Sequence, residues 1–163
     1  LSGPVDGERL DRGLQRLSSW GRRVEVAPNL RHRRGYLAGT DDERLAGLDA
    51  VLEAGARTVI AARGGYGITR LLPRLPWDRL VEQGVRFVGF SDVTALLSPL
   101  VDRGGAVQIH GPMVASGLDD TGSARRLLDL LEGRLVGAQL FTYDACQLLR
   151  REAGWDTAHR GEA

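Results

Sequence analysis

Short apolar runs alternate with amphipathic segments along most of this chain, and that order limits the folds it can adopt. Three runs have the length and composition of buried strands, over residues 58–62, 86–90 and 106–109, and a fourth covers 23–27. Strands that alternate with helices form mainly parallel sheets flanked by helices. The sequence therefore predicts an α/β domain of the Rossmann-like or flavodoxin-like three-layer type.

Leucine spacing and capping residues mark the helices expected between these strands. Thr40 and Glu43 form a capping-box pattern before one helix, which Gly55 would end. Residues 28–39 show no period and contain four basic side chains, which indicates a long exposed loop. Further helices are predicted over residues 6–20, 77–83, 93–103 and 121–132, with a shorter helical piece interrupted by Pro73 and Pro76.

The composition is typical of one globular domain. Hydrophobic residues make up 42% of the 163 residues and charged residues 26%, which allows a buried core. A net charge of +1 gives no field that would attract nucleic acid or an anionic membrane, and no apolar run approaches the ~20 residues of a membrane span. Cys146 has no partner for an internal disulfide, so the cytosol is the expected compartment.

All 22 basic residues are arginine, which excludes several kinds of site. Without lysine there can be no lysine Schiff base, no P-loop lysine and no Ser-Lys hydrolytic pair. The chain opens at Leu1 rather than at a methionine.

The first strand-to-helix junction is rich in glycine. Ligands of parallel sheets bind beyond the carboxyl ends of the strands, and Gly64–Gly67 follows the strand over 58–62. Glycines there let the backbone approach a ligand and leave N–H groups free for an oxyanion. The same residues also suit an ordinary tight turn. Arg63 could hold a substrate carboxylate through its fork of donors, or lie on the surface without a ligand.

The other two junctions carry a serine and a histidine. Ser91 lies between a strand and a helix, where a nucleophile elbow exposes a hydroxyl and the next residue offers an oxyanion N–H. On spacing alone, Ser91 or Asp92 could equally cap the helix that follows. His110 directly follows the last strand, in a predicted loop, and could act as a base or as a structural hydrogen-bonding residue.

Together, the three junctions resemble one known family. The chain is similar to the LD-carboxypeptidases, serine peptidases of family S66 that include the microcin C self-immunity peptidases. The similarity rests on Ala62–Gly67, Arg70–Pro73, Val88–Leu96 and His110–Met113, with Gly35–Gly39, Asp41 and Asp42 upstream, and it extends from about Pro4 to Met113.

This resemblance implies a cytoplasmic hydrolase that releases the terminal D-alanine of a murein tetrapeptide in peptidoglycan recycling. Ser91 matches the family nucleophile, and the backbone N–H groups of Gly65 and Asp92 match its oxyanion hole. The expected substrate-binding residues are Arg63, Gly64, Tyr66 and His110. No metal or organic cofactor is implied. The expected partner is a small peptide or muropeptide, and the resemblance leaves open a homodimer of the full-length form.

The resemblance also implies that parts of the enzyme are missing. Residues 1–137 are predicted to form the amino-terminal domain and 138–163 a poorly matching tail, whereas the family's Glu and His triad partners lie in a carboxyl-terminal domain that is absent here. The family's first strand is absent too. His32, His110 and His159 do not match the missing histidine, so we expect weak activity or none.

Two alternatives stay open beside this leading function. One is a microcin-immunity-type peptidase that acts on an acyl-sulfamoyl or aminoacyl-nucleotide amide. The other is a non-catalytic remnant or binding module. A nucleotide-binding flavodoxin-like domain would need a phosphate loop after a first strand, which this sequence does not contain.

Overall fold

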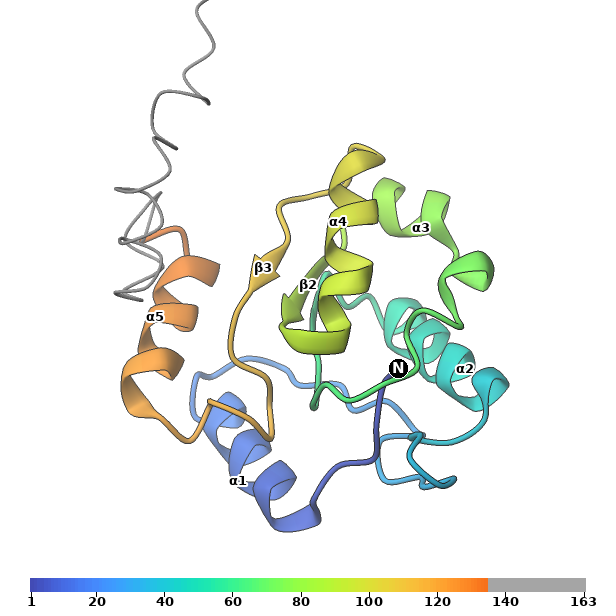
Figure 1. Cartoon of the computed structure of the whole chain (residues 1–163). Coiled ribbons are helices and arrows are strands. Elements are labelled where there is room, and N and C mark those ends of the chain that lie inside the picture. The colour runs from blue at the N-terminus through green and yellow to red at the C-terminus, as the bar shows by residue number, and fades with distance from the viewer. Residues whose placement is uncertain (135–163) are drawn as a thin grey trace, which may run out of the picture. The chain divides into compact units, whose positions relative to one another are not determined.

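The computed structural model of the chain describes residues 1–134, and apart from one predicted strand its elements follow the predicted order of helices and strands (Figure 1). Residues 1–124 form one compact unit, and a second begins at Arg125. The helices are α1 (Gly7–Ser18), α2 (Asp41–Glu53), α3 (Trp77–Glu82), α4 (Thr94–Asp102) and α5 (Thr121–Leu131); the strands are β1 (Thr58–Ile60), β2 (Arg86–Gly89) and β3 (Ile109–His110); two 3-10 helices are η1 (Leu72–Arg74) and η2 (Ser91–Val93).

The three strands form a parallel sheet with β2 in the centre. Val59 lies opposite Phe87 in β2, and Gly89 lies opposite His110 in β3. The prediction of an α/β domain with a parallel sheet is thus confirmed. Because the strands run in one direction, the segments that follow them all emerge at one edge of the sheet.

One hydrophobic core joins the sheet to three helices. Phe87 of β2 is buried together with leucines of α2, α3 and α4. In α2 and α4 the buried residues recur three or four positions apart, as the leucine spacing predicts. Helix α1 is buried elsewhere: Gly13 allows its backbone to approach Val114, and a Cβ atom at Gly13 would lie only 2.0 Å from the Val114 carbonyl oxygen.

The strand predicted over residues 23–27 does not form. These residues are irregular and have no ladder partner among the described residues, and Val26 is 49% exposed. The alternation of apolar and polar residues is present, but a strand exists only where a neighbouring backbone completes its hydrogen bonds. The prediction was therefore wrong for this segment.

The last strand is shorter and later than predicted. It begins at Ile109, because the Gln108 side chain occupies the place where a ladder would continue. Its amide oxygen accepts from the Phe87 N–H at 2.7 Å, and its nitrogen donates to the carbonyl of Val85 at 3.1 Å. His110 consequently belongs to β3 itself, and not to the loop after it as predicted.

Residues 28–39 form the expected loop, without helix or named strand. Its buried anchor is Asn29, whose amide donates to the Ala38 carbonyl at 3.0 Å. The Ala38 N–H in turn donates to the carbonyl of Ser2 at 3.0 Å, so the loop ends against the amino-terminal segment. The predicted domain boundary at residue 137, the tail 138–163 and His159 lie outside the described residues. No helix within residues 1–134 combines the length and apolar character needed to cross a membrane.

The capping box of α2 gives a first test of the fold. The Thr40 hydroxyl accepts from the Glu43 N–H at 3.1 Å, and the Glu43 carboxylate accepts from the Thr40 N–H at 2.7 Å. We expect Thr40→Ala to lower the free energy of unfolding by about 1 kcal/mol, because α2 loses one partner for its first-turn N–H groups. Urea unfolding measures the change. Thr94→Ala, at the start of α4 where no side chain caps the helix, is the control and should stay within about 0.5 kcal/mol.

Candidate active site

Ser91 lies at a sharp turn between β2 and the helices that follow. Phe90 is extended, with φ −140° and ψ −175°, and Ser91, the first residue of η2, then adopts φ +61°. Within residues 1–134 it is the sole non-glycine residue with a positive φ. Such a conformation costs on the order of 1–3 kcal/mol and is concentrated at functional sites. The turn therefore has the backbone geometry of a nucleophile elbow.

The glycine before this turn explains how it closes. A Cβ atom on Gly89 would lie 2.8 Å from a methyl carbon of Val93, closer than real side chains approach each other. Val93 is 2% exposed and belongs to the hydrophobic core. Glycine at position 89 thus lets η2 fold back against the end of β2, which leaves Ser91 exposed at the outside of the turn.

The glycine-rich loop after β1 lies directly against Ser91. A Cβ atom on Gly64 would lie 3.0 Å from Ser91 Cβ and 3.2 Å from its Oγ. Gly65 and Gly67 have φ values of +133° and +127°, in the region that favours glycine. The prediction that Ser91 starts a helix and faces the Gly64–Gly65 turn is confirmed as geometry.

The third junction reaches the same place through an aromatic contact. The His110 ring lies 6.2 Å from the Phe90 ring, measured between centroids, at a tilt of 48°. The chain after β3 also continues along the first junction, since Val114 donates to the carbonyl of Ala61 at 2.9 Å. The three predicted junctions therefore meet around Phe90 and Ser91.

Two predicted substrate-binding residues belong to this region: Arg63 directly precedes the glycine-rich loop, and Tyr66 lies within it. Arg63 is exposed and donates to the carbonyls of Gly64 and Pro4, both at 3.1 Å, so part of its guanidinium supports the loop itself. Tyr66 is 54% exposed and lies beside Tyr36 of the 28–39 loop, with ring centroids 5.8 Å apart. Their exposed rings form an aromatic surface next to the glycines.

Two backbone donors near Ser91 are unused. In the described part of the chain, the N–H groups of Gly65 and Asp92 donate to no protein atom. The Asp92 side chain, by contrast, is engaged: its Oδ2 accepts from the Ser2 hydroxyl at 2.6 Å and from the Ile68 N–H at 3.2 Å. The Asp92 carboxylate thus binds the protein itself, whereas its backbone N–H is left for another acceptor.

No described histidine is placed as a base for Ser91. His32 pairs with Glu43 at 3.2 Å, in the loop before α2. His110 contacts Phe90 through its ring, and no hydrogen bond joins either histidine to Ser91 Oγ among residues 1–134. The described residues thus hold an exposed serine and two N–H groups that donate to none of them, and no described histidine is placed to take the proton of the serine.

Sequence reasoning missed one residue beneath this site, Arg44 of α2. It is 0% exposed and donates to the carbonyl of Gly67 at 3.1 Å, to the carbonyl of Leu1, and to Asp41 Oδ1 at 2.6 Å. Asp41 also binds Arg70 at 3.1 Å. An arginine within an amphipathic helix is normally exposed, so only its position on the apolar face, four residues before Leu48, gave a signal.

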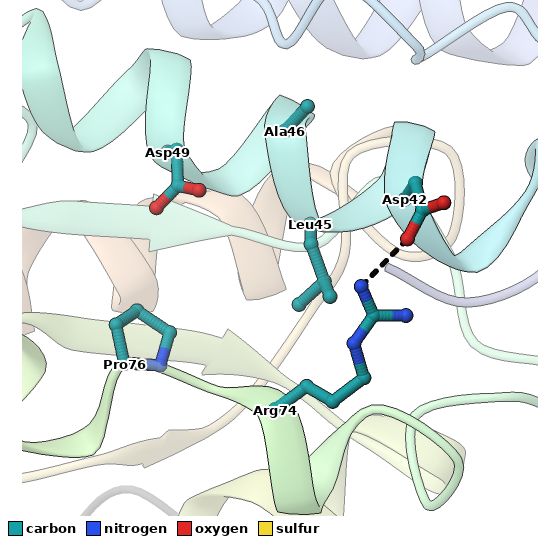
Figure 2. Close-up of a pocket in the computed structure, with 6 residues that line it drawn as sticks. All are labelled: Asp42, Leu45, Ala46, Asp49, Arg74 and Pro76. Atoms are coloured by element: carbon teal, nitrogen blue, oxygen red, sulfur yellow. Dashed lines mark hydrogen bonds and ion pairs between the residues drawn. The ribbon is translucent and has the colours of Figure 1, made fainter.

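A separate pocket of about 320 Å³ opens on another part of the surface (Figure 2). Figure 2 shows Arg74 extended toward Asp42, to which it donates at 2.6 Å. The other carboxylate at the pocket, Asp49, pairs with Arg79 at 3.4 Å. Its lining residues are Asp42, Leu45, Ala46, Asp49, Arg74 and Pro76. None of the predicted site residues lines it, so it is not the site around Ser91.

Comparison with known proteins identifies the family. Residues 1–111 match the model of the LD-carboxypeptidase N-terminal domain of the S66 peptidases. The chain belongs to this family. A Streptomyces coelicolor relative is 44% identical over 129 residues, which are 76% of this chain and 41% of that protein. The murein tetrapeptide carboxypeptidase of Pseudomonas aeruginosa is 40% identical over 111 residues, 67% of this chain and 36% of that enzyme.

Solved structures show the same fold. A muramoyltetrapeptide carboxypeptidase from Oxalobacter formigenes matches with a TM-score of 0.67 and 32% identity, over 80% of this chain and 46% of that one. An MccF-like protein from Bacillus anthracis matches with a TM-score of 0.72 and 23% identity, over 80% of this chain and 42% of that one, which shows the fold alone. This S66 chain thus spans less than half the length of these relatives.

The strained turn predicts an unusual ranking of substitutions at Ser91. Ser91→Gly should be more stable than Ser91→Ala by about 1 kcal/mol, since glycine adopts φ +61° without a steric penalty and alanine does not. Urea unfolding of the two variants measures the difference. Equal stability of the two would show that the turn relaxes and is not strained.

Asp41 predicts how stability depends on pH. A hydrogen bond from Arg44, followed by one from Arg70, lowers the pKa of Asp41 below its ordinary value of 3.8. A lowered pKa in the folded state adds stability that is fully present above the unfolded pKa and is lost as the pH falls through the folded value. When the pH is lowered from 5 into the acid range, we expect the free energy of unfolding of Asp41→Asn to fall less than that of the parent chain. Urea midpoints measured at each pH would show this. If the urea midpoints of the two proteins fell equally with pH, Asp41 would not be a source of the pH dependence.

Proposed function

We propose that this S66 chain is the nucleophile-bearing part of a serine-type LD-carboxypeptidase that releases the terminal D-alanine of a murein tetrapeptide. The observation that carries the proposal is the strained, exposed Ser91 packed against Gly64, with the unused N–H groups of Gly65 and Asp92 nearby. Serine attack on an amide needs an exposed hydroxyl and preorganised donors where negative charge develops. The names of the Pseudomonas and Oxalobacter relatives support the substrate class.

The proposed reaction passes through an acyl-enzyme. Ser91 Oγ adds to the carbonyl carbon of the terminal amide while a base takes its proton. The resulting oxyanion is held by the N–H groups of Gly65 and Asp92. When the intermediate collapses, the amide C–N bond breaks and the D-alanine nitrogen receives the proton. Water then attacks the ester and frees Ser91 by the same two steps.

The base in this scheme lies outside the described residues. His32 is committed to Glu43, and His110 is not bonded to Ser91. The resemblance of the sequence to the family implies a Glu and a His in a carboxyl-terminal domain. We therefore infer that residues 1–134 position the substrate and stabilise the oxyanion, and that a further part of the enzyme takes the proton from Ser91.

The remaining site residues have proposed roles in binding. Gly64 lets the glycine-rich loop approach Ser91 closely, and Arg63 has N–H groups beyond those given to Gly64 and Pro4 that can bind the terminal carboxylate of the substrate. Tyr66, beside Tyr36, and His110, beside Phe90, each present an exposed ring that can contact the substrate. We propose a cytoplasmic place of action, in turnover of cell-wall peptides, and a muropeptide as the partner. A homodimer stays a prediction for the full-length form.

The experiment is D-alanine release from murein tetrapeptide. We expect the 163-residue chain alone to turn over far below ordinary enzyme rates of about 1–10³ per second, because none of residues 1–134 is placed to act as a base for Ser91. Adding the carboxyl-terminal half of a full-length relative in trans should raise release, and Ser91→Ala should abolish that gain.

The controls separate the alternatives. His110→Ala should leave the gain in trans largely unchanged, whereas full activity of the chain alone would show that a base exists within these residues. An aminoacyl sulfamoyl adenosine, offered in parallel, tests the microcin-immunity-type alternative. Absence of Ser91-dependent hydrolysis of either substrate in the reconstituted pair would favour a non-catalytic binding module.

A further inference from the structure

One peptide unit of the glycine-rich loop is held from both ends. The carbonyl of Gly67 accepts from Arg44 at 3.1 Å, and the N–H of the same peptide, on Ile68, donates to Asp92 Oδ2 at 3.2 Å. A peptide is planar, so fixing its oxygen and its N–H fixes its orientation. The two partners come from α2 and from η2, on different sides of the loop.

The same two side chains also hold the amino-terminal segment. Arg44 donates to the carbonyl of Leu1, and Asp92 accepts from the Ser2 hydroxyl at 2.6 Å. That segment packs on the loop, because a Cβ atom on Gly65 would lie 3.2 Å from the Gly3 nitrogen. Arg44 and Asp92 therefore bind both the amino-terminal segment and the glycine-rich loop, and so fix these two neighbouring segments relative to each other.

Stability alone gives no reason for an arginine at this place. Arg44 is 0% exposed, and its Nε is buried without a hydrogen-bond partner. Burying a charge carries a desolvation cost that an ion pair often fails to repay, and well-packed apolar replacements are frequently neutral or stabilising. Among residues 1–134, the one carboxylate that pairs with Arg44 is that of Asp41, which Arg70 also binds. Geometry offers a reason, since a guanidinium can bind two carbonyls and a carboxylate at once.

We propose that Arg44 and the Asp92 carboxylate are positioning residues that fix the Gly67–Ile68 peptide and so hold Gly64 and Gly65 against Ser91. The inference builds on the proposed function, because it gives the oxyanion donors a fixed place. Gly67 makes this possible: a Cβ atom there would lie 2.7 Å from Arg44 Nη1 and 2.6 Å from a methyl carbon of Leu37. Neither side chain touches the reacting atoms in this scheme.

Amide hydrogen exchange of the intact 163-residue chain tests the clamp without any chemistry at Ser91. In Arg44→Met, which keeps an unbranched apolar side chain and removes the donors, we expect exchange at Ile68 to rise at least about tenfold through local opening, while Val88 of β2 keeps its protection. Arg44→Lys should lie between the two, since an ammonium can keep one of the carbonyls. Arg74→Met is the matched control, because the Arg74 guanidinium also pairs with an α2 aspartate, Asp42, but among the described residues it donates to no backbone group of the glycine-rich loop.

A second variant covers the case in which Arg44→Met does not fold. Asp92→Ala removes the other half of the clamp at a partly exposed position, and it should raise exchange at Ile68 in the same way. Exchange at Ile68 within twofold of the parent chain in Asp92→Ala, or in a folded Arg44→Met, would overturn the proposal.

A chemical readout links the clamp to the site. In each chain reconstituted with the carboxyl-terminal half of a full-length relative, the rate at which a fluorophosphonate modifies Ser91 should fall about tenfold or more in Arg44→Met and stay unchanged in Arg74→Met, with Ser91→Ala as the blank. If the parent chain and Ser91→Ala were equally unmodified, the proposed function would be in doubt. The exchange result would still decide the clamp, because it does not depend on Ser91 as a nucleophile.

Discussion

The parallel pairing of β2 with strands on both sides is the constraint on which the rest of the structure depends. Phe87 and Val88 in β2 are almost fully buried, and their neighbours in β1 and β3 fix the register. Parallel strands end at one edge, so three segments far apart in the sequence are brought together beyond Gly89. The site is a consequence of that pairing, and each junction adds one part: free N–H groups, a hydroxyl, or an aromatic ring.

Close packing then decides which residue types can occupy these junctions. Gly64 and Gly89 have almost no room for a side chain, because Ser91 and Val93 fill the space beside them. Ser91, in contrast, keeps its side chain in a backbone conformation that suits glycine better. A glycine at position 91 would relieve the strain and remove the hydroxyl. Retaining a serine there at a steric cost is what a catalytic role requires and what a simple helix cap does not.

Sequence patterns predicted the elements with strong local signals. The capping box at Thr40, the leucine faces of α2 and α4, and the turn at Ser91 depend on residues close in sequence, and all appear in the structure. The segment over 23–27 failed because a strand needs a distant neighbour that no local pattern supplies. The start of β3 failed because one side chain, Gln108, satisfies backbone groups that a longer ladder would have used. The family-like motifs located Ser91 and Gly65, whereas Arg44 carries no motif.

The two buried supports of the loop differ in a way that bears on how the site can change. The hydrophobic core resists motion through many weak contacts, and it tolerates exchange of one apolar side chain for another of similar volume. The Gly67–Ile68 peptide instead depends on two hydrogen bonds to charged groups, whose loss leaves buried polar atoms without partners. Small changes at Arg44 or Asp92 therefore act on the geometry of the loop before they act on the fold. Asp92 supplies a carboxylate to this peptide and, in the proposed mechanism, its own N–H to the oxyanion. A shift of the glycine-rich loop is therefore coupled to a shift of the Asp92 N–H donor.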